Sequence, residues 1–389
     1  FNPICRHEGE VVAAVAAETP YKARDALRAI QVEYEELPFV ADERDALAAD
    51  APLVHEGGNR VSDPSVYERG DLAGGFAEAD FVLEDEYRTE CELHTPLEPH
   101  GCVANWDGDS LTVWESTQGV FPVQQGVAQG LGMPMSKVRV VGDYMGGGFG
   151  SKLSAGKYTL LAALLAKQTA RPVKVFLSRE ETFLSVGNRP PANMRVKAGV
   201  KRDGTLTALE FVATATGGAY RAGGTSALDY LIRDLYQCDN VRAETADLYI
   251  NAGPARPMRA PGHPQCAWAL EQMMDSLAEA VGMDPVEFRL KNVPEVSQAR
   301  GGQPYTTAGL TDCIADGAEA FGWSEALARA DAVEDGSPVR RGVGMASALW
   351  AAGGGGPPAT VIMKLFSDGS LNLNMGASDI GTGTKTVMA

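Results

Sequence analysis

The stretch "KVRVVGDYMGGGFGSK" (137–152) decides how the rest of the chain is interpreted. Its first six residues are typical of a strand, and the four glycines that follow within "GGGFG" surround a single aromatic residue, Phe149. Because glycine has no side chain, a loop so rich in glycine lets another group approach its backbone closely. We expect the bare amides of this loop to face a bulky planar cofactor.

Two other interpretations of this loop are weighed against the sequence. A phosphate-binding loop would need Ser or Thr after its lysine, but Leu153 follows Lys152, and the dinucleotide spacing G-x-G-x-x-G is also unmet. A plain turn requires only one or two glycines. The turn remains an alternative, while close approach by a cofactor explains the loop most economically.

Regular elements of both kinds are predicted around this loop. The expected strands and strand-rich segments lie at 81–93, 101–106, 111–116, 172–181, 206–220 and from Val343 onward, with Asp107-Gly108 as a hairpin turn. The expected helices lie at 120–134, 157–170, 264–282 and after Asp284-Pro285, and a strand–helix–strand unit is expected at 10–37 with Thr19-Pro20 at the start of its helix. This mixture predicts an α+β architecture.

A second glycine loop, "GASDIGTGTKTV" (376–387), follows an alternating strand. The amides of Gly381, Thr382 and Gly383 are predicted to form an anion-binding nest for a phosphate, with threonine hydroxyls as further donors. A bare turn is the alternative here too. Two such loops in one chain favour a shared cofactor.

A third loop, "NAGPARPMRAPGHPQ" (251–265), contains four prolines and two glycines, which fix an irregular backbone. Arg259 in so rigid a loop suits an anion or an oxo group, because a guanidinium stays charged and presents fixed donors. A solvated loop arginine is the alternative. His263 is interpreted as a loop or helix-entry residue and not as a ligand.

Composition excludes several classes of function. The formal net charge of −17 argues against nucleic acid as a partner, and no apolar run reaches the roughly 20 residues of a membrane helix. The six cysteines include no C-x-x-C pair, which argues against zinc or iron–sulfur ligation within the chain. Because the chain opens on Phe1 and stops just after a glycine turn, we expect it to be a piece of something longer.

Taken together, these stretches resemble the molybdenum-binding subunit of the xanthine dehydrogenase/aldehyde oxidase family. The resemblance is carried, in order along the chain, by "HEGEVVAAVAAET…AIQVEYEELP", "LEPHGCVANW", "STQGV", "GGGFGSK", "RAPGHPQCAWALEQMMDSLAEAVGMDPVEFRLKN" and "DIGTGT". It implies the C-terminal part of an α/β-hammerhead domain followed by multi-layer molybdopterin-binding domains. The expected divisions are a hammerhead-like segment at 1–50, a connector at 51–80, a first cofactor domain at 81–330 and the start of a second at 331–389.

The resemblance also implies roles for individual residues. Gln118 is similar to the glutamine that hydrogen-bonds the apical oxo group of molybdenum, and Arg259 to an arginine that approaches the active site. Arg233, on a gapped match, is similar to an arginine on the substrate side. Implied catalytic residues are Gln118, Phe149, Arg259 and Arg233. Implied cofactor-binding residues are Gln118, Gly147, Gly148, Phe149, Gly150, Arg259, Ala260, Gly381, Thr382, Gly383 and Thr384. The metal itself is expected to be held through the pterin dithiolene and not by side chains.

Three departures from the family pattern restrict the expected activity. Leu153 stands where purine-specific members have a glutamate, and Ala260 follows Arg259 with no reactive cysteine beside it, which argues against carbon monoxide as the substrate. No residue here matches the family's catalytic glutamate. We therefore expect an aldehyde or another electron-poor carbon to be oxidised with water-derived oxygen. An N-heterocycle or aromatic dehydrogenase is the first alternative, and a non-catalytic scaffold subunit is the second.

The resemblance finally implies cofactors and partners. The expected cofactor is molybdenum-molybdopterin in its cytosine dinucleotide form, with 2Fe-2S clusters and FAD on separate partner subunits. A further chain that completes the molybdenum domain is also considered. The expected compartment is the cytoplasm, with the periplasm as the alternative.

Overall fold

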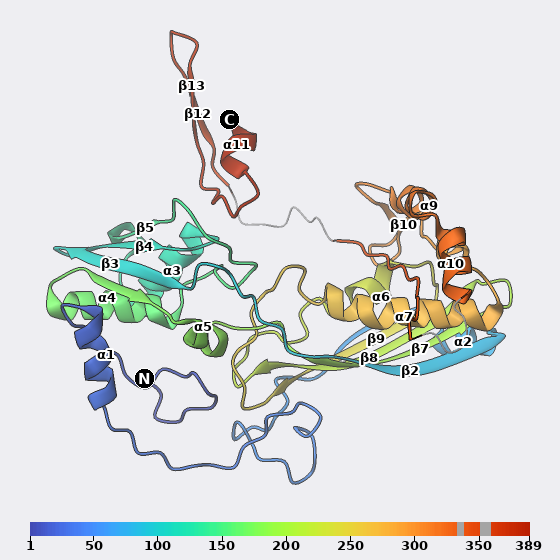
Figure 1. The fold of residues 1–389 in the computed structure, drawn as a ribbon, viewed down its shortest axis with the longest axis horizontal. Coiled ribbons are helices and arrows are strands. Elements are labelled where there is room, and N and C mark those ends of the chain that lie inside the picture. Colours follow the sequence, from blue (N-terminus) through green and yellow to red (C-terminus); the bar gives the residue numbers. More distant parts are fainter. Residues whose placement is uncertain (333–337, 351–358) are drawn as a thin grey trace.

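The computed structural model describes residues 1–332, 338–350 and 359–389. Two lobes, each a sheet covered by helices, lie side by side, and a hairpin near the C-terminus projects from them (Figure 1). Helices and strands occur throughout both lobes. The predicted α+β architecture is therefore confirmed.

The first lobe is built on a four-stranded sheet in the order β5-β4-β3-β6. Its strands are β3 (Gly101–Asp107), β4 (Ser110–Glu115), β5 (Val138–Val141) and β6 (Val173–Phe176). The Asp107↔Ser110 pair closes the β3–β4 hairpin at the predicted turn, and β5 runs parallel to β4. Because β5 ends at Val141, the glycine loop begins at the edge of this sheet.

Helices α3 (Val120–Leu131) and α4 (Lys157–Thr169) pack on this sheet. Gly132 ends α3 in the left-handed conformation with φ +64, as the sequence predicts for a helix that stops at this glycine. Buried side chains from both helices and the sheet form one core, which consists chiefly of Val113, Val123, Val127, Ala162 and Ala166. The loops that leave β4 and β5 are thus anchored to a rigid base.

The second lobe holds a five-stranded sheet in the order β1-β9-β8-β7-β2. Its strands are β1 (Ser65–Arg69), β2 (Phe81–Thr89), β7 (Ala192–Val200), β8 (Leu206–Gly218) and β9 (Val241–Tyr249). Neighbours pair antiparallel except β8 and β9, which run parallel. Residues 65–69, expected within a connector, therefore supply an edge strand of this sheet.

Helix α7 (His263–Val281) covers the sheet of the second lobe and packs on β2 and β7 (Figure 1). Its buried positions recur at the spacing of one helical face and include Cys266, Ala269, Leu270, Met273 and Leu277. The helix begins directly after the "RAPG" loop, so its packing on the sheet holds the end of that loop in place. Three short helices complete this lobe: α2 (Leu72–Ala77), α6 (Tyr230–Asp234) and α8 (Pro285–Lys291).

The N-terminal segment differs from the strand–helix–strand unit expected at 10–37. Helix α1 (Pro20–Ala29) forms as predicted, and the Thr19 hydroxyl accepts a hydrogen bond from the Lys22 amide at its start. The two predicted strands are wrong for the described structure, because no described segment pairs with residues 10–17 or 30–34. A strand needs a hydrogen-bonded neighbour, so these segments remain extended but unpaired.

Elements after the glycine-rich motifs differ in detail from the sequence prediction. The strand expected over 172–181 ends at Phe176, and helix α5 (Arg179–Ser185) follows because Ser178 and Glu181 form a capping box. Helices α9 (Leu310–Phe321) and α10 (Trp323–Asp331) occupy a stretch for which no helix or strand is predicted from the sequence. The capping box is a sequence signal for α5, and an apolar periodicity of 3.6 residues is the signal for α9 and α10, which begin without a side-chain cap.

The strand-rich segment expected from Val343 is only partly observed. Strands β12 (Ile362–Leu365) and β13 (Leu371–Asn374) form the projecting hairpin, and short helix α11 (Thr384–Met388) follows. No strand occurs at 343–350, and residues 351–358 of the expected segment lie outside the described part of the chain. The alternating stretch before the second glycine loop is thus confirmed as a strand, β13.

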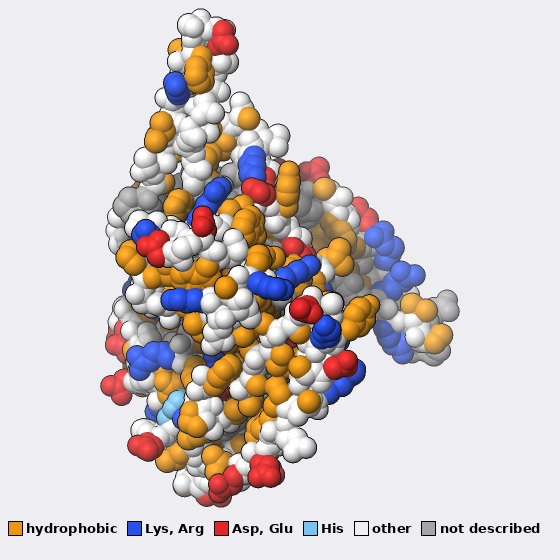
Figure 2. Space-filling model, turned by 90° about the vertical axis from the view of Figure 1, so that its left-hand side faces the viewer, with side chains coloured by type: hydrophobic (Ala, Val, Ile, Leu, Met, Phe, Trp, Pro, Cys, Tyr) orange, Lys and Arg blue, Asp and Glu red, His pale blue; other side chains and the backbone are white. Residues whose placement is uncertain are grey.

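The molecular surface agrees with a globular chain of mixed charge. On the face shown in Figure 2, Lys and Arg side chains lie among Asp, Glu and apolar side chains, and the hairpin extends beyond the main body. No helix among the described residues has the length and apolar character needed to cross a membrane.

Candidate functional site

The glycine loop that follows β5 lies against the segment that follows β4. The side-chain oxygen of Gln118 accepts hydrogen bonds from the backbone amides of Gly150 at 2.7 Å and Lys152 at 3.3 Å. The Gln118 amide donates in return to the Lys152 carbonyl at 2.8 Å. Gln118 and the glycine loop, predicted separately as site residues, are therefore brought together.

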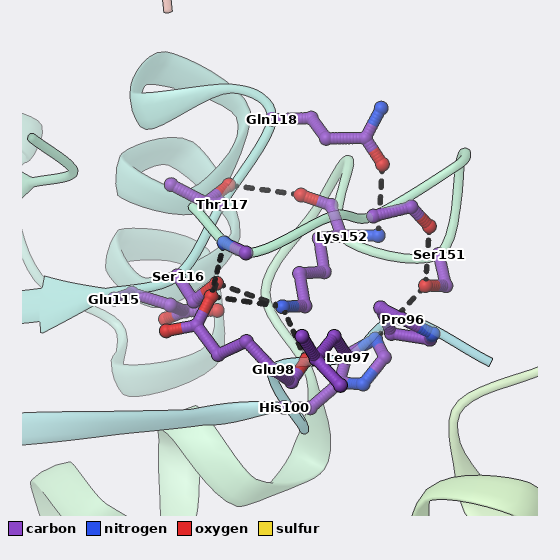
Figure 3. A network of polar contacts seen from close by, with 12 residues as sticks. Pro96, Leu97, Glu98, His100, Glu115, Ser116, Thr117, Gln118, Ser151 and Lys152 are labelled. Atoms are coloured by element: carbon purple, nitrogen blue, oxygen red, sulfur yellow. Dashed lines mark hydrogen bonds and ion pairs between the residues drawn. The ribbon is translucent and has the colours of Figure 1, made fainter. Parts of the chain in front are cut away.

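The carboxamide of Gln118 has a defined orientation. Because Oε1 accepts two backbone N–H groups, the Nε2 group must lie on the other side of the amide. Figure 3 shows this nitrogen pointing away from the loop backbone. Nε2 has no hydrogen-bond partner among the described residues, so two N–H donors are available to an oxygen of a bound group.

The glycine loop also interlocks with the "RAPG" loop. The Arg259 amide donates to the Phe149 carbonyl at 2.8 Å. Gly150 has φ +114, and a Cβ built on it would lie 1.9 Å from the carbonyl oxygen of Pro257. Only glycine fits this position. The two loops therefore form one continuous backbone surface beside Gln118.

Phe149 is the one aromatic residue of the glycine loop, and its backbone has φ +53, in the left-handed region that L-residues rarely adopt. Its side chain is 47% exposed. A Cβ on Gly147 would stand 3.2 Å from the Phe149 ring, so the absence of side chains there leaves room for this ring. The ring is thus presented at the surface of the glycine loop, next to Gly147.

Two residues that sequence reasoning missed hold the "RAPG" loop. The buried guanidinium of Arg189 donates to the carbonyls of Arg259 at 2.8 Å and Ala260 at 3.3 Å. His94 Nε2 lies 2.7 Å from the Pro257 carbonyl. Burial lowers the pKa of both Arg189 and His94. Arg189 stands between an Asn and two prolines, and that rigid setting is the sequence signal that could have identified it.

The side chain of Arg259 itself is exposed and forms no ion pair or hydrogen bond within the described residues. Its backbone is fixed on both sides, through Phe149 and Arg189. Ala260, which follows it, has φ +62. The loop thus presents a charged guanidinium on a rigid backbone, and that arrangement can bind an anionic or carbonyl group.

A second histidine supports the glycine loop from beneath. His100 Nε2 lies 3.0 Å from the Ser151 hydroxyl, which donates to the Gly148 carbonyl at 2.8 Å. Since the hydroxyl donates to that carbonyl, it must accept from Nε2, which therefore carries a proton. Burial, with the nearby Lys152 charge, lowers the pKa of His100 to about 3.

The amides of the C-terminal glycine loop have a partner within the chain. The amides of Gly381 and Gly383 donate to the Asp379 carboxylate at 3.0 and 3.2 Å, and these bonds lower the pKa of that acid. In the structure these two amides therefore bind the Asp379 carboxylate, and their role toward a phosphate stays a prediction. The hydroxyls of Thr382 and Thr384 hydrogen-bond each other at 3.1 Å.

This C-terminal loop nevertheless lies beside the first lobe. Lys385 Nζ donates to the Asp143 carbonyl at 3.2 Å, within the segment between β5 and the glycine loop. A Cβ on Gly376 would stand 2.3 Å from the ring of Phe121 in α3. At Gly381 and Gly383 a Cβ would meet nothing within 4 Å, so the loop backbone faces open space.

Arg233 is not brought to this group. It lies on α6 in the second lobe, pairs with Asp229, and its guanidinium stands 4.7 Å from the centre of the Tyr67 ring. None of its recorded contacts is with Gln118, the glycine loop or Arg259. Among the described residues, Arg233 therefore has no direct contact with the group around Gln118.

Two further observations concern cavities and metal ligands. A cavity of about 860 Å³ lies between the N-terminal segment and α4 with β6, and neither Gln118, Phe149 nor Arg259 lines it. Within the described ranges, no three His, Cys, Asp or Glu side chains are grouped so that they could hold a metal ion. The site at Gln118 is thus an open surface of backbone amides and one carboxamide.

Comparisons with known proteins identify the family of this chain. Two family models described as the molybdopterin cofactor-binding domain match residues 54–293 and 316–389. The model described as the a/b hammerhead domain of aldehyde oxidase and xanthine dehydrogenase matches residues 1–38. All the residues gathered around Gln118, the glycine loop and the "RAPG" loop fall within the first of these matches.

Curated relatives match almost the whole chain. The xanthine dehydrogenase molybdenum-binding subunit of Escherichia coli is 35% identical over 99% of this chain and 52% of its own length. The aldehyde oxidoreductase molybdenum-binding subunit PaoC of Escherichia coli is 32% identical over 100% of this chain and 51% of its own length. The chain thus spans about half the length of the curated relatives it matches.

A solved structure has the same fold. The aldehyde oxidoreductase of Desulfovibrio gigas superposes with a TM-score of 0.79 and 28% sequence identity, over 92% of this chain and 40% of that one. The family matches, the relatives and the shared fold point the same way. This chain belongs to the molybdenum-binding subunits of the xanthine dehydrogenase and aldehyde oxidoreductase family.

Proposed function

We propose that this chain carries the molybdenum-cofactor face of an oxidoreductase that oxidises an aldehyde or another electron-poor carbon with oxygen from water. The observation that carries the proposal is the Gln118 carboxamide, whose oxygen is held by the Gly150 and Lys152 amides. This leaves its Nε2 donors directed away from the loop backbone and free to bind another group. A preorganised donor of this kind stabilises negative charge on a bound oxygen.

The described residues fit a molybdopterin group on two grounds. The unpartnered Nε2 of Gln118 suits an oxygen of the metal centre, and the loop amides from Gly147 to Phe149 suit the pterin. We propose the cytosine dinucleotide form of the cofactor. The open backbone at Gly381 and Gly383 suits the phosphates of that form, provided that the Asp379 carboxylate leaves these amides. When bound, this cofactor supplies a two-electron oxidation with oxygen taken from water.

The chain's own contribution is binding and orientation. Gln118 donates to the cofactor, while Arg259 binds a carbonyl or anionic group of the substrate from the rigid "RAPG" loop. Arg189 and His94 hold that loop through three backbone carbonyls, so the backbone that carries the guanidinium does not need to be ordered when substrate binds. Preorganisation of this kind favours turnover over mere affinity.

Substrate class rests on few residues. Leu153, 39% exposed, is an apolar side chain directly after the glycine motif and offers no hydrogen bond to a purine. That favours an aldehyde. The 35% identity to a xanthine dehydrogenase subunit favours an N-heterocycle instead, and we keep that as the second candidate.

Partner subunits are part of the proposal. The relatives described above are themselves named as subunits, which supports an assembly in which electrons leave through other chains. We propose an iron–sulfur subunit and an FAD subunit for this role. Arg233, which has no contact with Gln118 in the described residues, is kept as a candidate for the substrate side.

The test is an activity screen of the native complex with a dye as electron acceptor, together with molybdenum analysis. Aldehydes, purines, nicotinate-like rings and aromatic thioesters are compared as substrates. Stoichiometric molybdenum with turnover of aldehydes supports the proposal, and turnover of rings alone supports the second candidate. A complex that stays free of molybdenum after expression with ample molybdate would instead indicate a non-catalytic scaffold.

A further inference from the structure

Lys152, the last residue of the glycine motif, is buried with an exposure of 1%. Its ammonium group has three acceptors: the Ser116 hydroxyl at 2.8 Å, the Glu98 carbonyl at 2.9 Å and the Glu98 carboxylate at 3.3 Å. An ammonium group has three N–H donors, so these contacts account for all of them. Figure 3 shows the Lys152 side chain turned inward toward Glu98 and Ser116, away from the Gln118 carboxamide.

Glu98 holds both ends of the glycine loop through one oxygen. Its Oε2 accepts from the Gly146 amide at 2.7 Å, where the loop begins, and from Lys152, where it ends. The same atom accepts from the Ser116 hydroxyl at 2.5 Å. A Cβ on Gly146 would stand 2.5 Å from the Glu98 Cβ, so the backbone approaches this acid as closely as glycine permits.

The backbone of Lys152 binds the segment that carries Gln118. Its carbonyl accepts from the Gln118 amide at 2.8 Å and the Thr117 hydroxyl at 2.9 Å, and its own amide donates to Gln118 Oε1. The one residue thus links a buried ion pair to the orientation of the Gln118 carboxamide. Any shift of Lys152 moves two of the bonds that fix that carboxamide.

The charge state of the pair follows from its surroundings. Burial raises the pKa of Glu98, but hydrogen bonds from Ser116 and Gly146 and the Lys152 charge outweigh it, so the net pKa is lowered. Burial lowers the pKa of Lys152, opposed by the Glu98 charge. A buried ammonium group that loses its partner carboxylate carries an uncompensated charge. Removal of either partner therefore destabilises the structure around the pair.

We propose that Glu98 and Lys152 are positioning residues of the cofactor site, whose ion pair holds the glycine loop so that the Gln118 carboxamide presents its N–H donors. The inference rests on the proposed function for its catalytic consequence. Its structural part, the restraint of residues 146–152, does not. The two parts are therefore measured separately.

The experiment uses the native complex with Glu98→Gln, Lys152→Met and the double variant. The matched control is Lys137→Met, which removes a lysine from an exposed ion pair with Asp109 in the same lobe. Hydrogen exchange of amides 146–152 reports on the loop, molybdenum content on cofactor retention, and kcat and KM on turnover. Loop exchange needs neither cofactor nor substrate.

We expect both single variants to speed exchange of amides 146–152 and to lower kcat or molybdenum content about 10- to 100-fold, with KM little changed. In the double variant, kcat or molybdenum content should fall by less than the product of the two single-variant factors, because no buried charge is left unpaired. Lys137→Met should match the wild type. If Lys152→Met does not fold, Glu98→Gln alone decides, because the Glu98 side chain is partly exposed.

Wild-type exchange of the loop amides in folded Glu98→Gln, with unchanged kcat and molybdenum content, would overturn the proposal. Faster exchange in the variants of a complex that contains no molybdenum would confirm the restraint and contradict the proposed function. Equal effects from Lys137→Met would show that any lost lysine acts through overall charge, which also overturns the assignment.

Discussion

The carbonyl oxygen of Pro257 occupies the space that a side chain on Gly150 would need, because a Cβ built there would lie only 1.9 Å from it. The two residues come from loops of different lobes. Their contact is continued by the Arg259 amide, which donates to the Phe149 carbonyl. The candidate site is therefore a junction between two lobes, closed at a point where only glycine fits.

Gly150→Ala is expected to abolish cofactor retention. The methyl group would push the two loops apart and strain a backbone with φ +114. Gly132→Ala is the control, because Gly132 also has a positive φ but a Cβ there meets nothing within 4 Å. Gly132→Ala should lose about 1–2 kcal/mol of folding stability from backbone strain, and Gly150→Ala should lose more because its methyl group also meets the Pro257 carbonyl. Only Gly150→Ala should lose molybdenum, measured by metal analysis of the purified complex, and equal molybdenum in both would contradict the argument.

Gln118→Glu separates the two functions of the carboxamide. A carboxylate can still accept the Gly150 and Lys152 amides, but it cannot donate to a bound oxygen. We expect kcat to fall by about 10²–10³, which corresponds to about 2.7–4 kcal/mol at the transition state, with the melting temperature unchanged. Gln118→Ala should lower kcat as much and also loosen the loop.

The control for this change is Gln125→Glu, on the exposed side of α3. It adds the same negative charge to the same lobe without touching the loop. The measurement is kcat from steady-state kinetics of both variants at full molybdenum occupancy. A Gln118→Glu enzyme with normal kcat would mean that the carboxamide serves only to hold the glycine loop.

Much of the fold could be predicted from local patterns. The helix that ends at Gly132 and the hairpin at Asp107-Gly108 were identified because a glycine with positive φ or a turn pair marks each boundary. Strands β7 and β9 were not identified. Their sheet order, with β9 between β1 and β8, depends on pairing between distant segments, which local periodicity does not reveal.

The candidate site shows the same division. Gln118, Phe149, Gly150 and Arg259 were identified from their motifs, and the structure brings them together. The residues that hold them were missed or left without a role, since His94 acts on Pro257 and Glu98 acts on Lys152 across long stretches of chain. Such contacts leave no local pattern, because a buried polar partner is chosen by the fold and not by its neighbours in sequence.

Glu115 should make stability depend on pH. This acid is 5% exposed at the end of β4, and its Oε1 accepts from the Tyr158 and Thr159 hydroxyls at 3.1 Å. Burial raises its pKa from 4.5 to about 7, although those hydrogen bonds and the Lys152 charge oppose the rise. Between these two values the folded state binds more protons than the unfolded state, so stability falls as pH rises, by roughly 3 kcal/mol in all.

Glu115→Gln removes this titration and should flatten the pH dependence between 4.5 and 7, with greater stability than the wild type at pH 8. Glu86→Gln, at an exposed position on β2, is the control and should leave the profile as it is. Urea unfolding of the complex at several pH values, followed by fluorescence, provides the measurement. A Glu115→Gln profile parallel to that of the wild type would show that Glu115 is not the group responsible.

Arg259→Ala should change which substrates the enzyme prefers. The guanidinium is exposed and unpaired among the described residues, while its backbone is held by Phe149 and Arg189, so it is free to bind a charged group on a substrate. A hydrogen bond to a charged group contributes about 1.5–3 kcal/mol, or roughly 10- to 150-fold in kcat/KM. We expect that loss for a substrate with a carboxylate, such as 4-carboxybenzaldehyde, and a much smaller loss for benzaldehyde.

Arg139→Ala, which removes an exposed arginine of β5, controls for overall charge and should leave the ratio of the two kcat/KM values unchanged. Equal losses for both aldehydes in Arg259→Ala would mean that the arginine maintains the loop and does not contact substrate, because a loop defect would affect both substrates alike.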